Sequence, residues 1–115
     1  MTRLMRPISW LKAARKGFEK LPHPVQLRCR LALAVAAEGG KANIAKPLKG
    51  LGSGVFEIAL PFRGDAFRVV YAVQFAEELW VVHAFQKKST RGIETPKHEM
   101  DLISSRLNRL REMLK

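Results

Sequence analysis

Residues 56–75 read FEIALPFRGDAFRVVYAVQF, and this stretch decides the fold. Large apolar residues occupy every second position from 56 to 62, and again every second position from 67 to 75. Alternation with a period of two is typical of strands that bury one face. Between the two runs, Arg63-Gly64-Asp65 has the composition of a turn. The stretch therefore predicts two antiparallel strands joined by a short turn.

The next apolar run extends this pair into a sheet. Glu77-Glu78 is polar and turns the chain into a third predicted strand, residues 79–86. On the second strand, strict alternation places Arg68 and Tyr71 on opposite faces unless a bulge intervenes. The three strands predict an antiparallel meander.

Two helices are predicted before the meander. Apolar residues recur at helical spacing over residues 9–21, with Ser9 as the N-cap and Pro22 at the end. A second helical pattern covers residues 25–38 and stops at Gly39-Gly40. Two adjacent helices with a short connection predict an antiparallel helical hairpin.

The remaining segments complete the chain. Residues 41–54 are rich in Lys, Pro and Gly, which predicts a loop with neither helix nor strand. Thr95 and Pro96 predict the N-cap and first position of a terminal helix. Its basic polar side, which carries Arg106, is most often a solvated face but can also lie against RNA. The predicted fold class is α+β: an N-terminal helical hairpin packed on a small antiparallel meander, with a C-terminal helix. One domain, residues 1–115, is expected from the length.

The charge of the chain points to a polyanionic partner. Lys and Arg number 21 against 10 Asp and Glu, so the formal net charge is +11 and the pI is near 10.6. Such an excess favours nucleic acid, although surplus lysines can also serve solubility alone. The single cysteine, Cys29, excludes an intramolecular disulfide. With no secretory leader and no apolar run of ~20 residues, a cytoplasmic protein without a membrane partner is expected.

Cations and aromatic residues are interleaved along the meander and at its ends. The set consists of Lys46, Lys49, Arg63, Arg68, Tyr71, His83, Phe85, Gln86, Lys87, Lys88 and Arg91. Rings that stack on bases, beside cations that meet phosphates, are typical of a nucleic-acid surface. The sequence has no Cys or His cluster at metal-ligand spacing and no nucleotide-binding glycine loop. We therefore expect no metal and no cofactor.

Metal-free cleavage of RNA fits this residue set. The substrate supplies its own nucleophile, the 2′-hydroxyl, so the enzyme has to move protons and stabilise charge on the phosphorane. His83 is the candidate proton carrier, because the reference pKa of histidine, ~6.5, lies near working pH. Packing in the core is its structural alternative. Tyr71 is a secondary candidate, whose apolar neighbours favour a packing role.

Two further cationic positions favour a phosphate site. Arg68 interrupts a strand of Phe, Val, Tyr and Ala, which costs stability unless its face is open or its charge is paired. A functional role is favoured, and pairing with Glu57 on the neighbouring strand is the alternative. Lys87 and Lys88 end the third strand, where a solvated edge is the alternative to a phosphate site.

Several of these segments resemble the RelE/ParE toxin superfamily. Residues 67–73, FRVVYAV, resemble the central strand of these toxins. Residues 83–90, HAFQKKST, followed by Thr95-Pro96, are similar to the phage-derived HigB-like branch, and so are residues 46–51, KPLKGL. The resemblance covers nearly the whole chain in order.

The resemblance implies the toxin of a type II toxin–antitoxin system, a ribosome-dependent messenger RNA endonuclease that inhibits translation. Implied partners are messenger RNA, the ribosome and a cognate antitoxin with a HigA-like helix-turn-helix domain, through which alone the toxin would meet DNA. Arg68 matches the family's strand arginine that stabilises the transition state, and Lys88 falls near a second cation. RNA contacts are expected from Lys46, Lys49, Arg63, Phe85, Gln86 and Arg91.

The chain departs from RelE at two places. Glu57 and Ala59 stand where RelE has lysines, so the base would have to be Lys46, Lys49, Arg63 or His83. The family's late tyrosine is missing, because Tyr71 is the only tyrosine.

Two other functions remain as alternatives. A ParE-like inhibitor of DNA gyrase shares the fold but needs no nuclease site, and the cluster of Gln86-Lys87-Lys88 with Arg68 argues against it. A non-catalytic RNA-binding protein would use the same cations with stacking and no proton transfer. An activity assay separates it from a nuclease.

Overall fold

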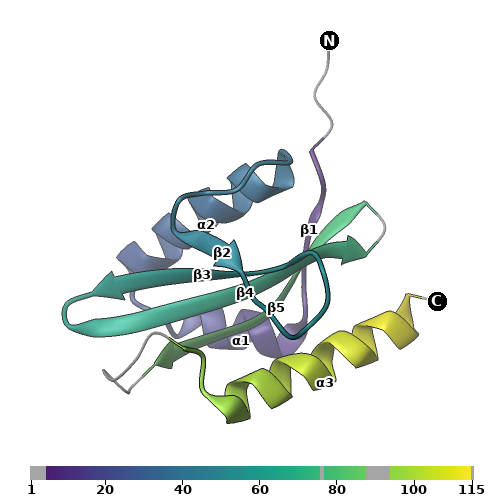
Figure 1. Cartoon of the computed structure of the whole chain (residues 1–115). Helices are drawn as coiled ribbons and strands as arrows, with labels where there is room; N and C mark the ends of the chain where they lie inside the picture. The colour runs from purple at the N-terminus through teal and green to yellow at the C-terminus, as the bar shows by residue number, and fades with distance from the viewer. Residues whose placement is uncertain (1–4, 76, 88–93, 115) are drawn as a thin grey trace.

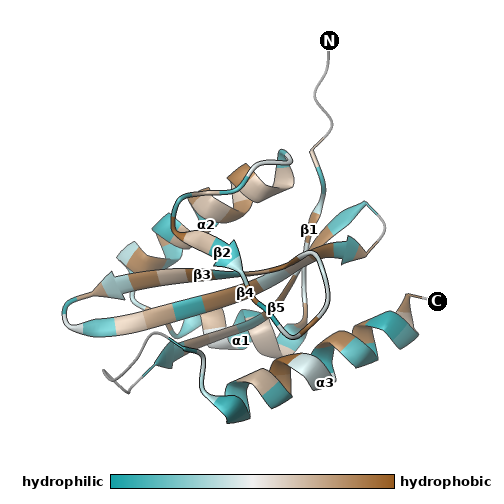
Figure 2. Cartoon of the chain, viewed as in Figure 1, coloured by the Kyte–Doolittle hydropathy of each residue, from teal (hydrophilic) through white to brown (hydrophobic). Residues whose placement is uncertain are grey.

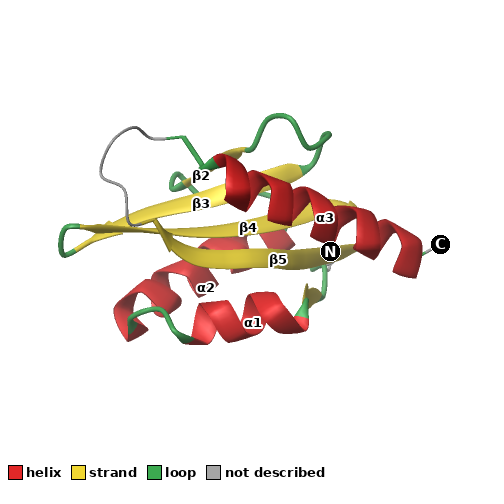
Figure 3. Cartoon of the chain, turned by 90° about the horizontal axis from the view of Figure 1, so that it is seen from below, coloured by secondary structure: helices red, strands yellow, loops and turns green. Residues whose placement is uncertain are grey.

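The computed structural model describes residues 5–75, 77–87 and 94–114. Its elements follow in the order β1 (Ile8–Trp10), α1 (Lys12–Glu19), α2 (His23–Ala37), β2 (Ala45–Pro47), β3 (Val55–Phe62), β4 (Asp65–Phe75), β5 (Glu78–Lys87) and α3 (Lys97–Met113). The strands form one sheet in the order β1-β5-β4-β3-β2, with β1 parallel to β5 and the other neighbours antiparallel. Helices α1 and α2 cover one face and α3 covers the other (Figures 1 and 3). The predicted α+β class is confirmed.

The sheet extends the predicted meander by a strand at each edge. Ser9 was expected to cap the first helix, but it lies in β1, pairs with Trp80, and its hydroxyl donates to a Glu78 carboxylate oxygen at 3.2 Å. Helix α1 begins at Lys12 without a side-chain cap. Residues 41–54 were expected to contain no strand, yet β2 forms there because its backbone pairs with β3. Pairing with a distant strand, rather than a local pattern, stabilises both three-residue strands.

The face under α1 and α2 is an apolar core. Tyr71, Phe18, Leu79 and Ile58 are among its fully buried side chains. Burial raises the pKa of Tyr71 to about 12 and that of Cys29, also in this core, to about 11. Figure 2 shows the hydrophobic residues that run along the central strands of the sheet.

Helix α1 approaches β5 closely at Gly17. A Cβ atom built on Gly17 would lie 2.6 Å from the carbonyl oxygen of Ala84, so the backbone there leaves no room for a side chain. A glycine is therefore required for this helix to pack on the sheet.

The other face holds a smaller apolar cluster under α3. Ile103, Leu107 and Leu110 of this helix pack on residues that include Val70 and Val82. Thr95 was expected to cap α3, but α3 begins after Pro96 and has no side-chain cap. The Thr95 hydroxyl donates instead to the Glu57 carboxylate on the sheet. Within the described residues, no helix has the length and apolar character that a membrane span requires.

Candidate active site

Besides Lys87 at the end of β5, three ionisable side chains of the sheet are buried on the face that α3 covers. Glu57 on β3, Arg68 on β4 and His83 on β5 are 1%, 5% and 7% exposed. In the register of the sheet, Val70 lies between Glu57 and His83 in one cross-strand row, and Arg68 lies in the next row on the same face. A single patch of the α3-covered face therefore gathers the polar residues of three strands.

The centre of the patch is a buried ion pair. Nη1 of Arg68 lies 2.6 Å from Oε1 of Glu57, which is the structural alternative expected for Arg68. The other carboxylate oxygen of Glu57 accepts a hydrogen bond from the Thr95 hydroxyl at 2.5 Å. Both oxygens of Glu57 are thus engaged, one by the sheet and one by the segment that leads into α3.

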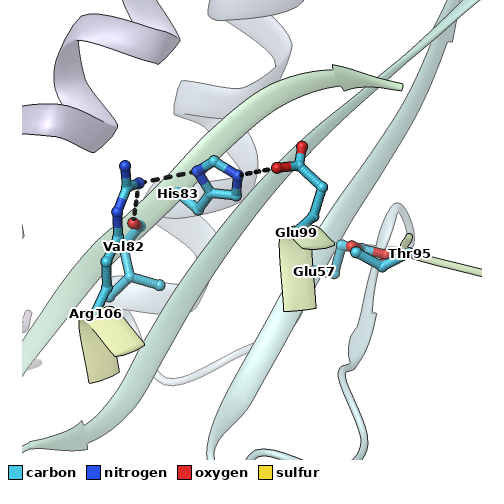
Figure 4. A network of polar contacts seen from close by, with 6 residues as sticks. All are labelled: Glu57, Val82, His83, Thr95, Glu99 and Arg106. Atoms are coloured by element: carbon cyan, nitrogen blue, oxygen red, sulfur yellow. Dashed lines mark hydrogen bonds and ion pairs between the residues drawn. The ribbon is translucent and has the colours of Figure 1, made fainter. Parts of the chain in front are cut away.

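A second polar cluster holds His83 from α3 (Figure 4). Nη1 of Arg106 lies 2.9 Å from Nδ1 of His83, and Oε1 of Glu99 lies 3.2 Å from Nε2. Because a guanidinium can only donate, Nδ1 must accept, so the proton sits on Nε2 and is donated to Glu99. Phe85 stacks on the ring at 4.8 Å between centroids.

The surroundings of His83 favour its neutral form. Burial lowers the pKa of His83, the hydrogen bond and charge of Glu99 raise it, and the charge of Arg106 lowers it; the net direction is downward from 6.5. The assigned tautomer agrees with this direction. His83 in this arrangement is a neutral ring with both nitrogens occupied.

A bulge in β5 puts His83 on this face. Val70 pairs with His83 and Tyr71 pairs with Val81, so Val82 is an extra residue on β5. If the register continued regularly from the Tyr71–Val81 pair, with no bulge, His83 would pair with Val69 and project into the α1–α2 core. The Val82 carbonyl accepts from Nη1 of Arg106 at 2.9 Å. Arg106 was expected to be solvated, but it stabilises the bulge and the histidine together.

Beside the ion pair, a pocket of about 540 Å³ opens to the surface. Its lining residues are Lys46, Pro47, Leu48, Lys49, Glu57, Glu94, Thr95 and Met100. Lys46 and Lys49 are exposed at its edge, while Glu57 reaches it from the sheet. The pocket therefore presents a buried carboxylate beneath two surface cations, a charge distribution that an RNA phosphate group and its 2′-hydroxyl could both use.

The other predicted residues are distributed around this patch. Tyr71 lies on the opposite face, where its ring stacks on Phe56 at 5.4 Å, as strict alternation predicted. Arg63 is exposed in the β3–β4 turn over the Phe62 ring, and Gln86 is exposed on β5. Lys87 is buried at the end of β5.

Two predicted residues cannot be placed. Lys88 and Arg91 lie outside the described residues. Among residues 5–75, 77–87 and 94–114, no three His, Cys, Asp or Glu side chains are grouped so that they could hold a metal ion.

Sequence reasoning missed the contribution of α3. Glu99 and Arg106 are seven residues apart, which places them on one side of a helix, two turns from each other. This spacing was a usable signal, but it indicates only that the two residues share a face. Which sheet residue they meet depends on the bulge and on the packing of α3.

Known proteins similar to this chain include one family and solved toxin structures. The family model of phage-derived Gp49-like proteins matches residues 16–108. Among solved structures, the chain is similar to a double arginine-to-alanine variant of the Escherichia coli toxin RelE in the free state, with a TM-score of 0.63 and 18% identity over 92% of this chain and 98% of that one. The toxin–antitoxin complex RelBE2 from Mycobacterium tuberculosis has a TM-score of 0.47 and 20% identity over 76% of this chain and 98% of that one. No curated protein matches the chain.

Proposed function

The chain belongs to the phage-derived Gp49-like proteins of the RelE/ParE toxin superfamily, and from this premise we propose that it is the toxin of a type II toxin–antitoxin system. Its activity is metal-independent, ribosome-dependent cleavage of messenger RNA in the cytoplasm, which inhibits translation. Its partners are messenger RNA, the ribosome and a cognate antitoxin with a HigA-like helix-turn-helix domain.

One observation carries the nuclease proposal: a buried Glu57–Arg68 pair borders a pocket edged by Lys46 and Lys49. Burial of a charge pair in a sheet is expensive, and replacement by apolar residues is often neutral or favourable for stability. The pocket is lined by two lysines and two carboxylates, Glu57 and Glu94. A buried pair that opens onto it beside two lysines has a chemical use that a core pair lacks. That use is proton transfer next to a charged phosphate.

In the proposed reaction, Glu57 accepts the proton of the RNA 2′-hydroxyl, in place of the four bases expected from the sequence. The 2′-oxygen attacks the adjacent phosphorus, and the bond from phosphorus to the 5′-oxygen breaks as that oxygen takes a proton. Arg68 stabilises the negative charge on the phosphorane. Lys46 and Lys49 hold the flanking phosphates, and Lys88, the residue after β5, protonates the leaving oxygen.

The two remaining candidates have different roles in this proposal. His83 positions α3 through Glu99 and Arg106, and unlike Glu57 it does not line the pocket edged by the lysines. Tyr71 packs in the core on the opposite face and takes no part in proton transfer. Further RNA contacts are proposed for Arg63, Phe85, Gln86, Lys87 and Arg91.

The test is inducible expression in growing bacteria, with messenger RNA 5′-ends mapped in translated and untranslated copies of one transcript. We expect cuts in the translated copy only, and their loss in Glu57→Gln. Glu94→Gln is the matched control, because Glu94 lines the same pocket but makes no bond to Arg68 among the described contacts. It should cut like the wild type.

Other outcomes would redirect the assignment. Growth arrest without any cuts would contradict the nuclease and favour a ParE-like target such as gyrase. RNA binding without cuts or arrest would favour a non-catalytic RNA-binding protein. Full cutting by a folded Glu57→Gln protein would remove Glu57 from the reaction.

A further inference from the structure

A second, separate groove lies between α1 and α3. Its volume is about 360 Å³, and its lining residues are Leu11, Lys12, Ala13, Lys16, Arg106 and Arg109. Four of the six are cations, and no acidic residue is among them. Lys12, Lys16 and Arg109 are exposed. The groove shares no lining residue with the pocket beside Glu57.

The cations of this groove repel one another. Lys12 and Lys16 are four residues apart on α1, and Arg106 and Arg109 are three apart on α3, so each pair lies on one side of its helix. Like charges at these spacings destabilise a helix. Burial lowers the pKa of Arg106, the charge of Glu99 raises it, and the charge of Arg109 lowers it further; the net direction is downward.

Glu99 acts on Arg106, but the three exposed cations of the groove have no ion pair with a carboxylate among the described residues. Within the part of the chain that the structure describes, the ion pairs join Arg68 to Glu57 and His83 to Glu99, and neither involves Lys12, Lys16 or Arg109. The folded protein thus concentrates repelling cations in a concave site, where an external anion would relieve the repulsion.

Arg106 gives the groove a fixed wall. Nη1 of its guanidinium donates to the Val82 carbonyl oxygen and to Nδ1 of His83, each at 2.9 Å. These two hydrogen bonds fix the orientation of the guanidinium. A preorganised guanidinium loses little conformational freedom when it binds a phosphate. The three exposed cations around it would supply further contacts along a chain of phosphates.

We propose that the groove lined by Lys12, Lys16, Arg106 and Arg109 binds consecutive phosphates of an RNA backbone. The contact is independent of base sequence, because cations that meet phosphates carry no base readout. The RNA is either the messenger strand or ribosomal RNA, which present the same phosphodiester chemistry. The choice of RNA as the anion rests on the proposed function.

The test compares two triple variants that each remove three positive charges. The groove variant is Lys12→Gln/Lys16→Gln/Arg109→Gln, and the control is Arg15→Gln/Lys20→Gln/Arg28→Gln, whose residues are exposed and lie outside the groove. Arg106 is left intact because it contacts His83. Two probes are titrated over a range of salt concentrations: a single-stranded 2′-O-methyl RNA, which cannot be cleaved through its 2′-oxygen, and purified small ribosomal subunits.

We expect the groove variant to bind at least one probe ~10-fold more weakly than the control variant, with a salt slope lower by ~2. A loss with single-stranded RNA identifies the messenger strand, and a loss with subunits alone identifies ribosomal RNA. Equal affinity of the two variants for both probes would overturn the proposal, and would leave an acidic protein segment as the anion. Cleavage is scored separately with the unmodified transcript, so a protein that binds but never cuts contradicts only the nuclease.

Discussion

The two faces of the sheet share the central strands β3, β4 and β5 but differ in the side chains that they bury. The face under α1 and α2 buries apolar side chains, with Tyr71 as its polar member. The face under α3 buries Glu57, Arg68 and His83, and holds a smaller apolar cluster. The apolar face supplies the stability that allows the other face to bury charge. Substitutions on the first should act through folding, and substitutions on the second should separate folding from activity.

The largest effect is expected from breaking the buried ion pair. Arg68→Ala leaves the Glu57 carboxylate buried without its cation and should lower the free energy of unfolding by about 3–5 kcal/mol. The double variant Glu57→Leu/Arg68→Met removes both charges and should unfold close to the wild type in urea, yet make no cuts in messenger RNA. A double variant as unstable as Arg68→Ala would show that the pair itself stabilises the fold.

A smaller effect is expected on the apolar face at Gly17. In Gly17→Ala, the new methyl group meets the Ala84 carbonyl oxygen, and α1 must move away from β5. We expect a loss of about 1–3 kcal/mol in urea unfolding. Cleavage per folded molecule should be retained. Wild-type stability of Gly17→Ala would mean that α1 shifts without cost. The control is Ala13→Gly, at an exposed position of α1, which measures the helix-propensity difference between glycine and alanine alone.

The pH dependence of stability is a finer test of the polar face. Because the folded-state pKa of His83 lies below 6.5, the unfolded chain takes up a proton first as the pH falls. The contribution of His83 is therefore complete above pH 6.5 and is lost as the pH falls through the lower folded-state value. Urea unfolding at about pH 5.5 and about pH 7.5 should show a difference that His83→Gln reduces.

Exposed His23 provides the control for this measurement. His23→Gln should keep the wild-type difference between the two pH values, since His23 is exposed on α2. If His83→Gln and His23→Gln change the stability difference between the two pH values equally, the environment of His83 is not the source of that pH dependence.

The smallest effect is expected from Tyr71→Phe. The ring keeps its stacking on Phe56, so the change in unfolding free energy should stay below about 1.5 kcal/mol. The number and position of cuts in messenger RNA should not change. Loss of cutting in this folded variant would place the Tyr71 hydroxyl in the reaction. The face under α1 and α2 would then contribute to catalysis as well as to stability.

The sequence predicts the faces of β4 but not the composition of the polar patch. Alternation alone places Arg68 opposite Tyr71 and on the same face as Glu57. The register, which makes Glu57 a diagonal neighbour of Arg68, comes from the structure. The placement of His83 depends on the extra residue Val82, and no glycine or turn residue marks that bulge. Short β1 was missed because Ile8 pairs with Leu79, and a three-residue strand carries no periodic pattern of its own.

The β1–β5 pairing also constrains the order in which the protein can fold. Residues 8–10 complete one edge of the sheet only after residues 79–81 have been made. Until β5 has been made, α1 lacks the strand against which Gly17 packs, and the apolar core under α1 and α2 is incomplete. Contacts of such high sequence separation slow folding and expose partly folded chains to aggregation and proteolysis. A chain interrupted before β5 is therefore expected to be degraded by proteases.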